Sequence, residues 1–258
     1  MRRKLVIGNW KMHGSLEANH ALISGLAKAL ERLSEADKTQ VVICPVSVHL
    51  AAAAQQLNGL PGQIGLGAQN VSHAASGAYT GEVAASMLAE AGVTLVLVGH
   101  SERRELFGEG DALVADKVAA VLDADMTPVL CVGESLAQRQ AGETESVVLR
   151  QLNAAVQRVG VEGIARSIVA YEPIWAIGTG ETATPEQAQE VHEALRKRLA
   201  ELDEELAANT PILYGGSVKA SNADALFAQP DIDGGLVGGA SLDAEEFSAI
   251  CASSGASA

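Results

Sequence analysis

Residues 128–171 read PVLCVGESLAQRQAGETESVVLRQLNAAVQRVGVEGIARSIVAY, and this stretch contains one full repeat of the pattern that decides the fold. An apolar run, Pro128–Val132, is followed by a helical pattern, Thr144–Val159, and then by a second apolar run, Ser167–Tyr171. Neither run shows the strict alternation of a strand with one face in water, so both strands are expected to be covered on both faces. Strands that alternate with helices at this spacing form a parallel sheet.

The same alternation extends along the chain in both directions. Apolar runs that predict strands are Lys4–Ile7, Gln40–Cys44, Ile64–Ala68, Leu95–Val98, Pro128–Val132, Ser167–Tyr171, Pro211–Tyr214 and Gly235–Val237. Helical patterns between them include Leu16–Leu33, Gly81–Ala91, Asp111–Ala124, Thr144–Val159 and Pro185–Leu206. Eight such units favour a closed α/β barrel, (β/α)8, with eight parallel strands and surrounding helices, although an open, doubly wound sheet is an alternative. Without a Pro-rich or Ser-rich linker, residues 1–258 are predicted to form a single domain of ordinary barrel length.

The composition limits the classes of partner. Asp and Glu number 32 against 18 Lys and Arg, which gives a formal net charge of −14 that repels nucleic acid and anionic membranes. No apolar stretch approaches the ~20 residues of a membrane span, and Leu5–Ile7 is too short for a signal peptide. Three widely spaced cysteines, Cys44, Cys131 and Cys251, are typical of free cytosolic thiols and not of a metal site. We therefore expect a cytoplasmic protein.

Polar residues follow the first and fourth runs, where a parallel barrel places its active site. Asn9 and Lys11 share a face if the first strand extends to Lys11, which could then point at an anion. An isolated lysine at such a position is, however, most often solvated. His100 can donate or accept a proton near neutral pH, and a short helix beginning at Ser101 or Glu102 would keep it uncharged. A structural histidine is the alternative.

A carboxylate, Glu172, follows the sixth run and leads into the segment Pro173–Gly180. The apolar start and Gly-rich end of this segment suit a lid that closes and excludes water. Loss of water would raise the basicity of Glu172. The alternative is an exposed carboxylate beside an ordinary turn.

Glycine pairs follow the last two runs, at 215–216 and 238–239. Backbone N–H groups in such loops can bind phosphate at a helix N-terminus, although turns also require glycine. Together with Lys11, these backbone dipoles would let an acidic chain bind an anion.

Taken in their order along the chain, the segments that follow these apolar runs resemble those of triosephosphate isomerases. The resemblance covers the chain from about Lys4 to Cys251 and rests on five motifs: GNWKM at 8–12, GHSERR at 99–104, YEPIWAIGTG at 171–180, YGGSV at 214–218 and GLVGGA at 235–240. It implies a TIM barrel that interconverts dihydroxyacetone phosphate and D-glyceraldehyde 3-phosphate through an enediolate, in glycolysis and gluconeogenesis. It also implies that no metal and no organic cofactor takes part.

The resemblance further implies a role for each matching residue. Glu172 would be the base that moves the proton between C1 and C2, and neutral His100 would polarise the carbonyl. Lys11 and Asn9 would stabilise the developing negative charge. The residues expected to bind the substrate are Asn9, Lys11, Gly178, Ser217, Gly238 and Gly239. Glu102 and Cys131 would support the site.

One further loop matches the family, and one residue departs from it. Gly77–Glu82 is similar to the family's interface loop, which implies a homodimer with Thr80 near the active site of the neighbouring subunit. Glu181 departs from the family, because many members have lysine at this end of the lid. A different barrel isomerase, or a non-catalytic phosphate-binding barrel, is the alternative function.

Overall fold

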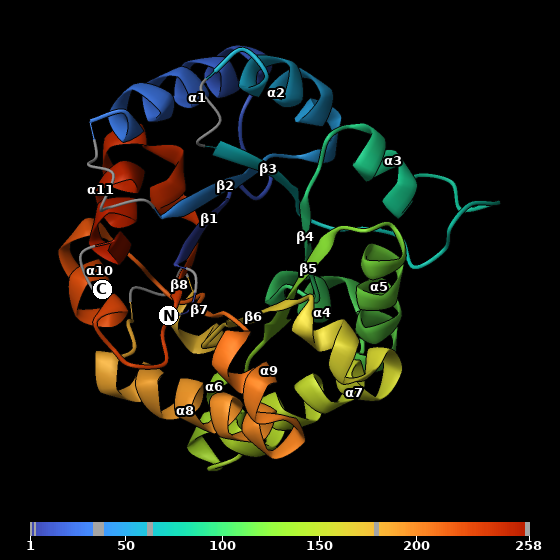
Figure 1. Cartoon of the computed structure of the whole chain (residues 1–258), viewed down its shortest axis with the longest axis vertical. Coiled ribbons are helices and arrows are strands. Elements are labelled where there is room, and N and C mark those ends of the chain that lie inside the picture. Colours follow the sequence, from blue (N-terminus) through green and yellow to red (C-terminus); the bar gives the residue numbers. More distant parts are fainter. Residues whose placement is uncertain (1, 3, 33–38, 61–63, 178–180, 256–258) are drawn as a thin grey trace.

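The computed structural model describes residues 2, 4–32, 39–60, 64–177 and 181–255. Eight parallel strands close into a barrel in the order of the sequence, with β1 paired to β8, and helices surround it (Figure 1). The predicted (β/α)8 TIM barrel is confirmed, and the open sheet is excluded. The strands are β1 (Leu5–Asn9), β2 (Gln40–Cys44), β3 (Ile64–Ala68), β4 (Leu95–Val98), β5 (Thr127–Val132), β6 (Ile168–Tyr171), β7 (Ile212–Tyr214) and β8 (Gly234–Val237).

The helices differ from the predicted ranges mainly at their ends. They are α1 (Leu16–Leu30), α2 (Leu50–Leu57), α3 (Ala85–Glu90), α4 (Ser101–Phe107), α5 (Asp111–Asp123), α6 (Leu136–Gln140), α7 (Thr144–Ala165), α8 (Pro185–Leu202), α9 (Glu204–Asn209), α10 (Ala220–Phe227) and α11 (Ala244–Gly255). Short 3-10 helices are η2 (Ser47–His49), η3 (Ile174–Ala176) and η4 (Gly239–Leu242). The helix predicted over Pro185–Leu206 is divided, because Asp203 is extended and its carboxylate accepts a hydrogen bond from Leu206 N at 2.8 Å, which starts α9.

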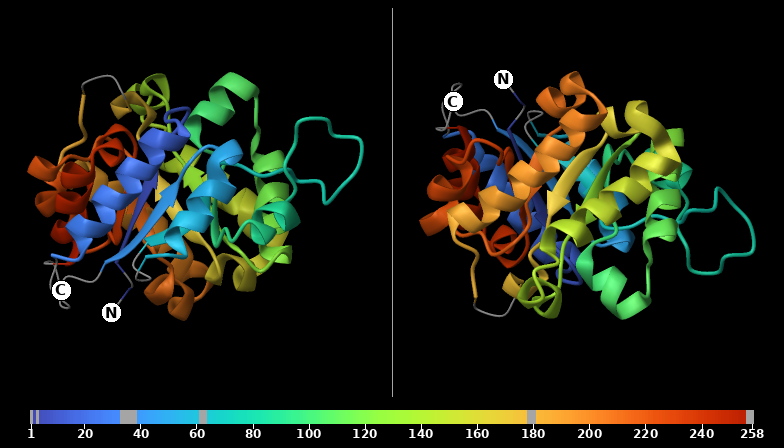
Figure 2. Two further views of the ribbon diagram at one scale, coloured as in Figure 1. Left: turned by 90° about the horizontal axis from the view of Figure 1, so that it is seen from above. Right: turned by 90° about the horizontal axis from the view of Figure 1, so that it is seen from below.

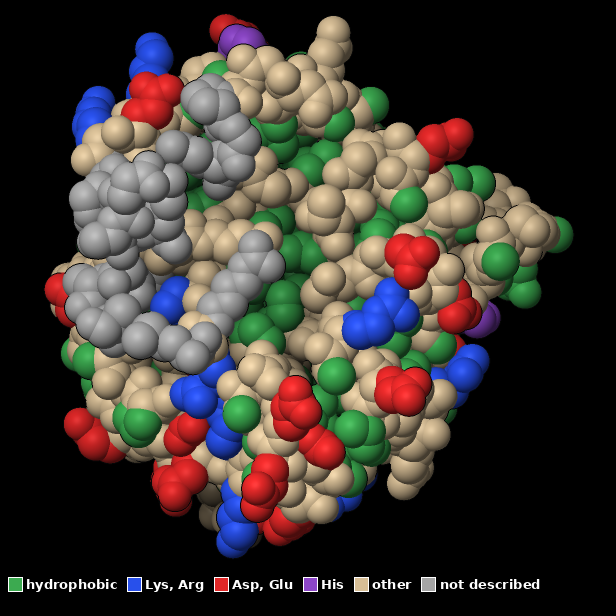
Figure 3. All heavy atoms as spheres, in the orientation of Figure 1, with side chains coloured by type: hydrophobic (Ala, Val, Ile, Leu, Met, Phe, Trp, Pro, Cys, Tyr) green, Lys and Arg blue, Asp and Glu red, His purple; other side chains and the backbone are tan. Residues whose placement is uncertain are grey.

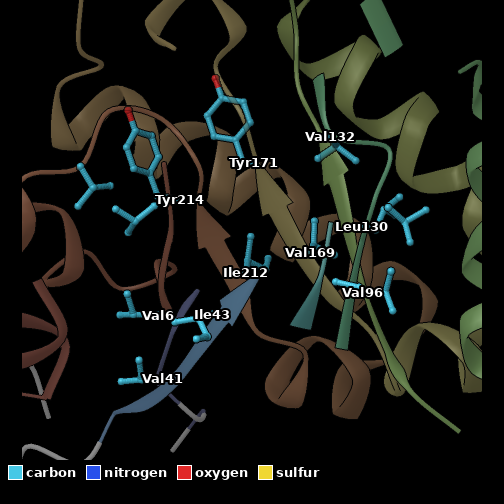
Figure 4. Close-up of a cluster of buried hydrophobic side chains, with 14 of the residues drawn as sticks. Val6, Val41, Ile43, Val96, Leu130, Val132, Val169, Tyr171, Ile212 and Tyr214 are labelled. Atoms are coloured by element: carbon cyan, nitrogen blue, oxygen red, sulfur yellow. The ribbon is translucent and has the colours of Figure 1, made fainter. Parts of the chain in front are cut away.

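Alternate strand residues fill the barrel and direct the site residues inward. The interior set is Leu5, Ile7, Val42, Cys44, Leu95, Leu97, Val129, Cys131, Ile168, Ala170, Leu213 and Leu236. Residues between them point outward and pack beneath the helices, as Figure 4 shows for Val6, Ile43 and Val96. Because side chains alternate with period two, Asn9 continues the inward series of β1 and Glu172 that of β6. Both therefore reach the mouth at the carboxyl ends of the strands.

The connection between β3 and α3 projects far from the barrel in both views of Figure 2. It contains the predicted interface loop Gly77–Glu82, in which Tyr79 is 50% exposed. The space-filling view shows hydrophobic side chains at the end of this projection (Figure 3). Such exposure is typical of a surface that contacts another molecule.

Within the described residues, no helix combines the length and apolar character needed to cross a membrane.

Candidate active site

A cavity of about 400 Å³ opens at the carboxyl ends of the strands. It brings together predicted site residues from five separate segments of the chain. Those that line it are Asn9, Lys11, His100, Glu172, Ser217, Gly238 and Gly239. Gly178, the remaining predicted substrate-binding residue, lies outside the described residues.

Lys11 reaches the cavity by a different route from the one the sequence suggested. Strand β1 ends at Asn9, and Lys11 has a φ of 50°, a left-handed conformation that is uncommon for residues other than glycine. Its N–H donates to Asn9 Oδ1 at 3.0 Å, and its carbonyl accepts from Gln69 Nε2 at 2.8 Å. These bonds hold the strained backbone, and Lys11 Nζ lies 2.5 Å from Glu102 Oε1.

His100 is positioned by a sharp turn between β4 and α4. Gly99 has a φ of 72°, and a Cβ there would lie 2.7 Å from Val114 Cγ1, so both backbone and space require glycine. Helix α4 begins at Ser101, one of the two predicted starts. The N–H of Glu102 donates to His100 Nδ1 at 3.2 Å. Nδ1 is thus the acceptor, and this hydrogen-bond pattern assigns the proton of the neutral ring to Nε2.

Glu172 is buried, with 2% of its surface exposed, and each of its oxygens has a partner. Oε1 lies 2.9 Å from His100 Nε2, and Oε2 accepts from Ser101 N at 2.9 Å. Gly133 permits this close packing, because a Cβ there would lie 1.8 Å from the carbonyl oxygen of Glu172. Cys131 is fully buried, and burial together with the Glu172 carboxylate raises the pKa of its thiol well above the usual range. The predicted pair of His100 and Glu172 is therefore in direct contact.

The two members of this pair shift each other's pKa in opposite directions. Burial is the largest single cause and lowers the pKa of His100, but the Glu172 and Glu102 carboxylates together raise it by more, so the net direction is upward. Burial raises the pKa of Glu172, but His100, the Ser101 N–H and Lys11 lower it by more. The sequence predicted that loss of water would raise the basicity of Glu172. In this arrangement the carboxylate is already buried, and its hydrogen-bond partners keep its pKa low.

The glycine-rich loops after β7 and β8 also line the cavity. A Cβ at Gly238 would lie 3.5 Å from Lys11 Cε, so the eighth loop and the lysine are close together. Among the described residues, none accepts a hydrogen bond from the N–H groups of Ser217, Gly238 or Gly239. These donors are available to an anion in the cavity.

A second buried carboxylate lies beside the start of the predicted lid. Glu134 Oε1 accepts from Trp175 Nε1 at 2.9 Å and from the hydroxyl of Tyr171 at 3.1 Å. These bonds connect the loop after β5 to β6 and η3. Arg139 was missed, although it lies 4.6 Å from the centre of the Trp175 ring and 3.4 Å from Glu134 Oε1. No motif marks this arginine.

In the part of the chain that the structure describes, no group of three or more His, Cys, Asp or Glu residues is arranged to bind a metal ion.

The chain is similar to known proteins over nearly its whole length. A model of the triosephosphate isomerase family matches residues 4–254. The triosephosphate isomerase of Thiobacillus denitrificans is 57% identical over 251 residues, which are 97% of this chain and 98% of the relative. That of Nitrosococcus oceani is 53% identical over 255 residues, 99% of this chain and all of the relative. That of Cupriavidus pinatubonensis is 56% identical over 250 residues, 97% and 99% of the two chains.

Proposed function

The chain belongs to the triosephosphate isomerase family, and we propose that the cavity residues divide the proton transfers of its reaction among them. The protein is an isomerase that interconverts dihydroxyacetone phosphate and D-glyceraldehyde 3-phosphate through an enediolate, in glycolysis and gluconeogenesis. The contact of His100 Nε2 with Glu172 Oε1, at the barrel mouth beside Lys11, carries the assignment of roles.

Glu172 is the general base. It takes a proton from C1 of the ketose and returns it to C2, which requires that the carboxylate leave its present partners. Departure from His100 and Ser101 removes two causes of its low pKa, so the carboxylate becomes a stronger base where the substrate needs it. Tuned acid–base groups of this kind are established for enzymes of this family.

His100 is the acid–base group for the two substrate oxygens. Nε2 gives its proton to one oxygen of the enediolate and then takes up the proton of the other oxygen, which restores the neutral ring. The Glu102 N–H supports this role, because it keeps Nδ1 an acceptor and fixes the tautomer. Once Glu172 moves toward the substrate, burial again favours the neutral ring. Lys11 and Asn9 stabilise the negative charge of the enediolate.

The phosphate is bound by backbone N–H groups. Ser217, Gly238 and Gly239 line one wall, and Gly178 of the lid completes the set. This arrangement suits a chain of net charge −14, since fixed backbone dipoles attract an anion without adding ionised groups. Glu102 and Cys131 support the site by contacting Lys11 and Glu172.

We also propose a homodimer through the projecting loop. A second cavity of about 480 Å³ lies beside Lys11 and is lined in part by Met12 and Phe107, which are 91% and 68% exposed. The loop Gly77–Glu82 of a neighbouring subunit, which carries Thr80 and the half-exposed Tyr79, would pack against this surface. Light scattering should give about twice the chain mass of 26.6 kDa, and a mass near 26.6 kDa would contradict the dimer.

Residues 1–258 form one catalytic domain, which β1 and β8 support because they are neighbours in the same barrel. The domain acts in the cytoplasm on a small triose phosphate, without nucleic acid, membrane, metal or organic cofactor.

A coupled assay of glyceraldehyde 3-phosphate conversion, without added metal, tests the proposed roles. Glu172→Gln should lower kcat by about 10²–10⁴-fold, because proton transfer loses its base. Glu190→Gln, at an exposed position of α8, makes the same chemical change and should leave kcat unaltered. A folded Glu172→Gln within about 3-fold of the parent kcat would refute Glu172 as the base. A folded parent without turnover would favour a different barrel isomerase or a non-catalytic barrel.

A further inference from the structure

Lys219 places an exposed cation on the wall of the catalytic cavity, and neither the family motifs nor the proposed chemistry gives it a role. It follows Ser217 and Val218, which line the same wall. Lys11, the other lysine of the cavity, is paired with Glu102. Among the described residues, no carboxylate oxygen lies within 4.0 Å of Lys219 Nζ, so its charge is not neutralised locally.

The backbone of Lys219 is fixed in place. Its N–H donates to Asn222 Oδ1 at 2.8 Å, and Asn222 Nδ2 donates to the carbonyl of Ser217 at 3.1 Å. The next N–H, that of Ala220, donates to Glu246 Oε1 at 2.8 Å. The side chain therefore starts from a rigid loop at the first turn of α10, and its ammonium stays near the cavity mouth.

The net charge of the chain makes such a cation useful. A triose phosphate dianion approaches a protein of net charge −14, whose overall field opposes its arrival. Attraction must come from charges near the mouth, because exposed charges are screened beyond about 10 Å at 0.1 M salt. Backbone N–H donors act only at hydrogen-bond distance, so they bind the phosphate but contribute little to its capture.

We propose that Lys219 is a substrate-capture residue whose ammonium draws the phosphate group to the cavity mouth and so raises the rate of association. It takes no part in the proton transfers. The inference rests on the proposed function, because it assumes that a triose phosphate enters this cavity. It goes beyond that function by dividing recognition between a long-range cation and short-range backbone donors.

The dependence of kcat/KM on ionic strength tests the proposal. Lys219→Gln should lower kcat/KM by about 3- to 10-fold at ~10 mM salt and by less than ~1.5-fold at ~0.5 M, with kcat unchanged. Lys219→Arg should restore the parent value. Lys28→Gln is the matched control, because Lys28 is exposed in the last turn of α1, at the far end of the barrel. At low salt, the loss of kcat/KM in Lys28→Gln should be less than half of the loss in Lys219→Gln.

Three results would overturn the proposal: equal losses for Lys219→Gln and Lys28→Gln, a loss that does not shrink with salt, or a fall in kcat itself. Inorganic phosphate provides an assay that does not require turnover. Its binding, measured by calorimetry, should weaken in Lys219→Gln at low salt and match the parent at high salt. An inactive parent that still shows this difference would contradict the proposed function and support capture of phosphate by Lys219.

Discussion

Two charge clusters, each with one buried carboxylate, lie at opposite ends of the barrel, and they are built differently. The mouth cluster, at the carboxyl ends of the strands, consists of Lys11, Glu102, His100 and Glu172. The floor cluster, at the amino ends, consists of Arg2, Arg196, Asp231 and Asp233. Both contain a carboxylate side chain that is 2% exposed, namely Glu172 and Asp233.

The two buried carboxylates, Asp233 and Glu172, differ in the number of hydrogen-bond partners that each would have to lose in order to move. Asp233 receives Arg2 Nε at 2.7 Å on one oxygen, and Arg196 Nη2 at 2.6 Å and Ile212 N at 2.9 Å on the other. Arg196 also donates to the carbonyls of residues 207 and 210, which connects α8 to the chain entering β7. Glu172 has one partner on each oxygen. The floor cluster therefore stabilises the fold, whereas the mouth cluster leaves its carboxylate free to exchange a partner for substrate.

Removal of a cation from the floor cluster should give the largest effect. Arg196→Met removes one of the two arginines that pair with both Asp231 and Asp233, together with two hydrogen bonds to backbone carbonyls, and we expect a loss of about 3–5 kcal/mol in the free energy of unfolding. Denaturant unfolding at one fixed protein concentration measures it. The kcat of the folded variant should stay within about twofold of the parent, because the change is at the far end of the barrel.

Arg198→Met is the control for this substitution. Arg198 is on the same helix, pairs with Glu201 near the surface and donates to Asn153, so its loss should cost about 1 kcal/mol or less. If the two variants lost similar stability, the floor cluster would not be the structural element that its hydrogen bonds indicate.

His192 provides a pH test of the same region. It is fully buried in α8, its Nδ1 lies 3.2 Å from the carbonyl oxygen of Asp231, and burial lowers its pKa to about 4. The unfolded chain binds this proton near pH 6.5, whereas the folded protein resists it until near pH 4, so stability falls as the pH falls between these values. The contribution is about 3 kcal/mol in total.

Unfolding free energies of the parent and His192→Gln, measured from pH 7 to 4.5, isolate this contribution. The variant should show a smaller loss of stability on acidification, and His20→Gln, on the exposed side of α1, should match the parent. Equal slopes for His192→Gln and the parent would mean that the folded protein accepts the proton on His192 without cost.

The contrast between the clusters also explains what the sequence revealed. The mouth residues follow strand ends in recognisable motifs, so Asn9, Lys11, His100 and Glu172 were predicted and lie together in the cavity. The repeated alternation of apolar runs with helical patterns predicted the barrel, because both patterns can be read from local sequence. The break at Asp203 was missed, since a cap competes with helix continuation only when its side chain reaches the next turn.

The floor cluster was not predicted at all. Arg2, Arg196 and Asp233 are separated by large parts of the chain and meet only when β8 closes against β1. Their positions carry no spacing that distinguishes them from solvated charges. The turn at Lys11 was missed for a similar reason, because Gln69 holds its backbone from a different loop.

Shortening the mouth carboxylate should affect catalysis but not stability. Glu172→Asp withdraws the carboxylate by about 1 Å, and a displacement of this size should lower kcat/KM by about 10²-fold. The free energy of unfolding should change by less than about 1 kcal/mol, since few partners depend on the side chain. Asp233→Glu makes the reverse change at the floor and should lower stability by about 1–3 kcal/mol with kcat retained. A loss of stability in Glu172→Asp and a loss of kcat in Asp233→Glu would contradict the catalytic role of the mouth cluster and the structural role of the floor cluster.

The smallest effect should come from removing a hydrogen bond to Glu134, a buried carboxylate that belongs to neither cluster. Glu134 is fully buried, and Oε1 accepts from Trp175 and Tyr171, which lie where β6 leads into η3. Trp175→Phe removes one hydrogen bond, worth about 1 kcal/mol or roughly a fivefold change in an equilibrium or rate. We expect this loss in kcat/KM and not in the free energy of unfolding, because Trp175 lies within the predicted lid segment, Pro173–Gly180. Leu136→Ala, exposed on α6 nearby, controls for simple loss of surface and should change neither. A loss confined to the free energy of unfolding would assign Glu134 a structural role, like that of the floor cluster.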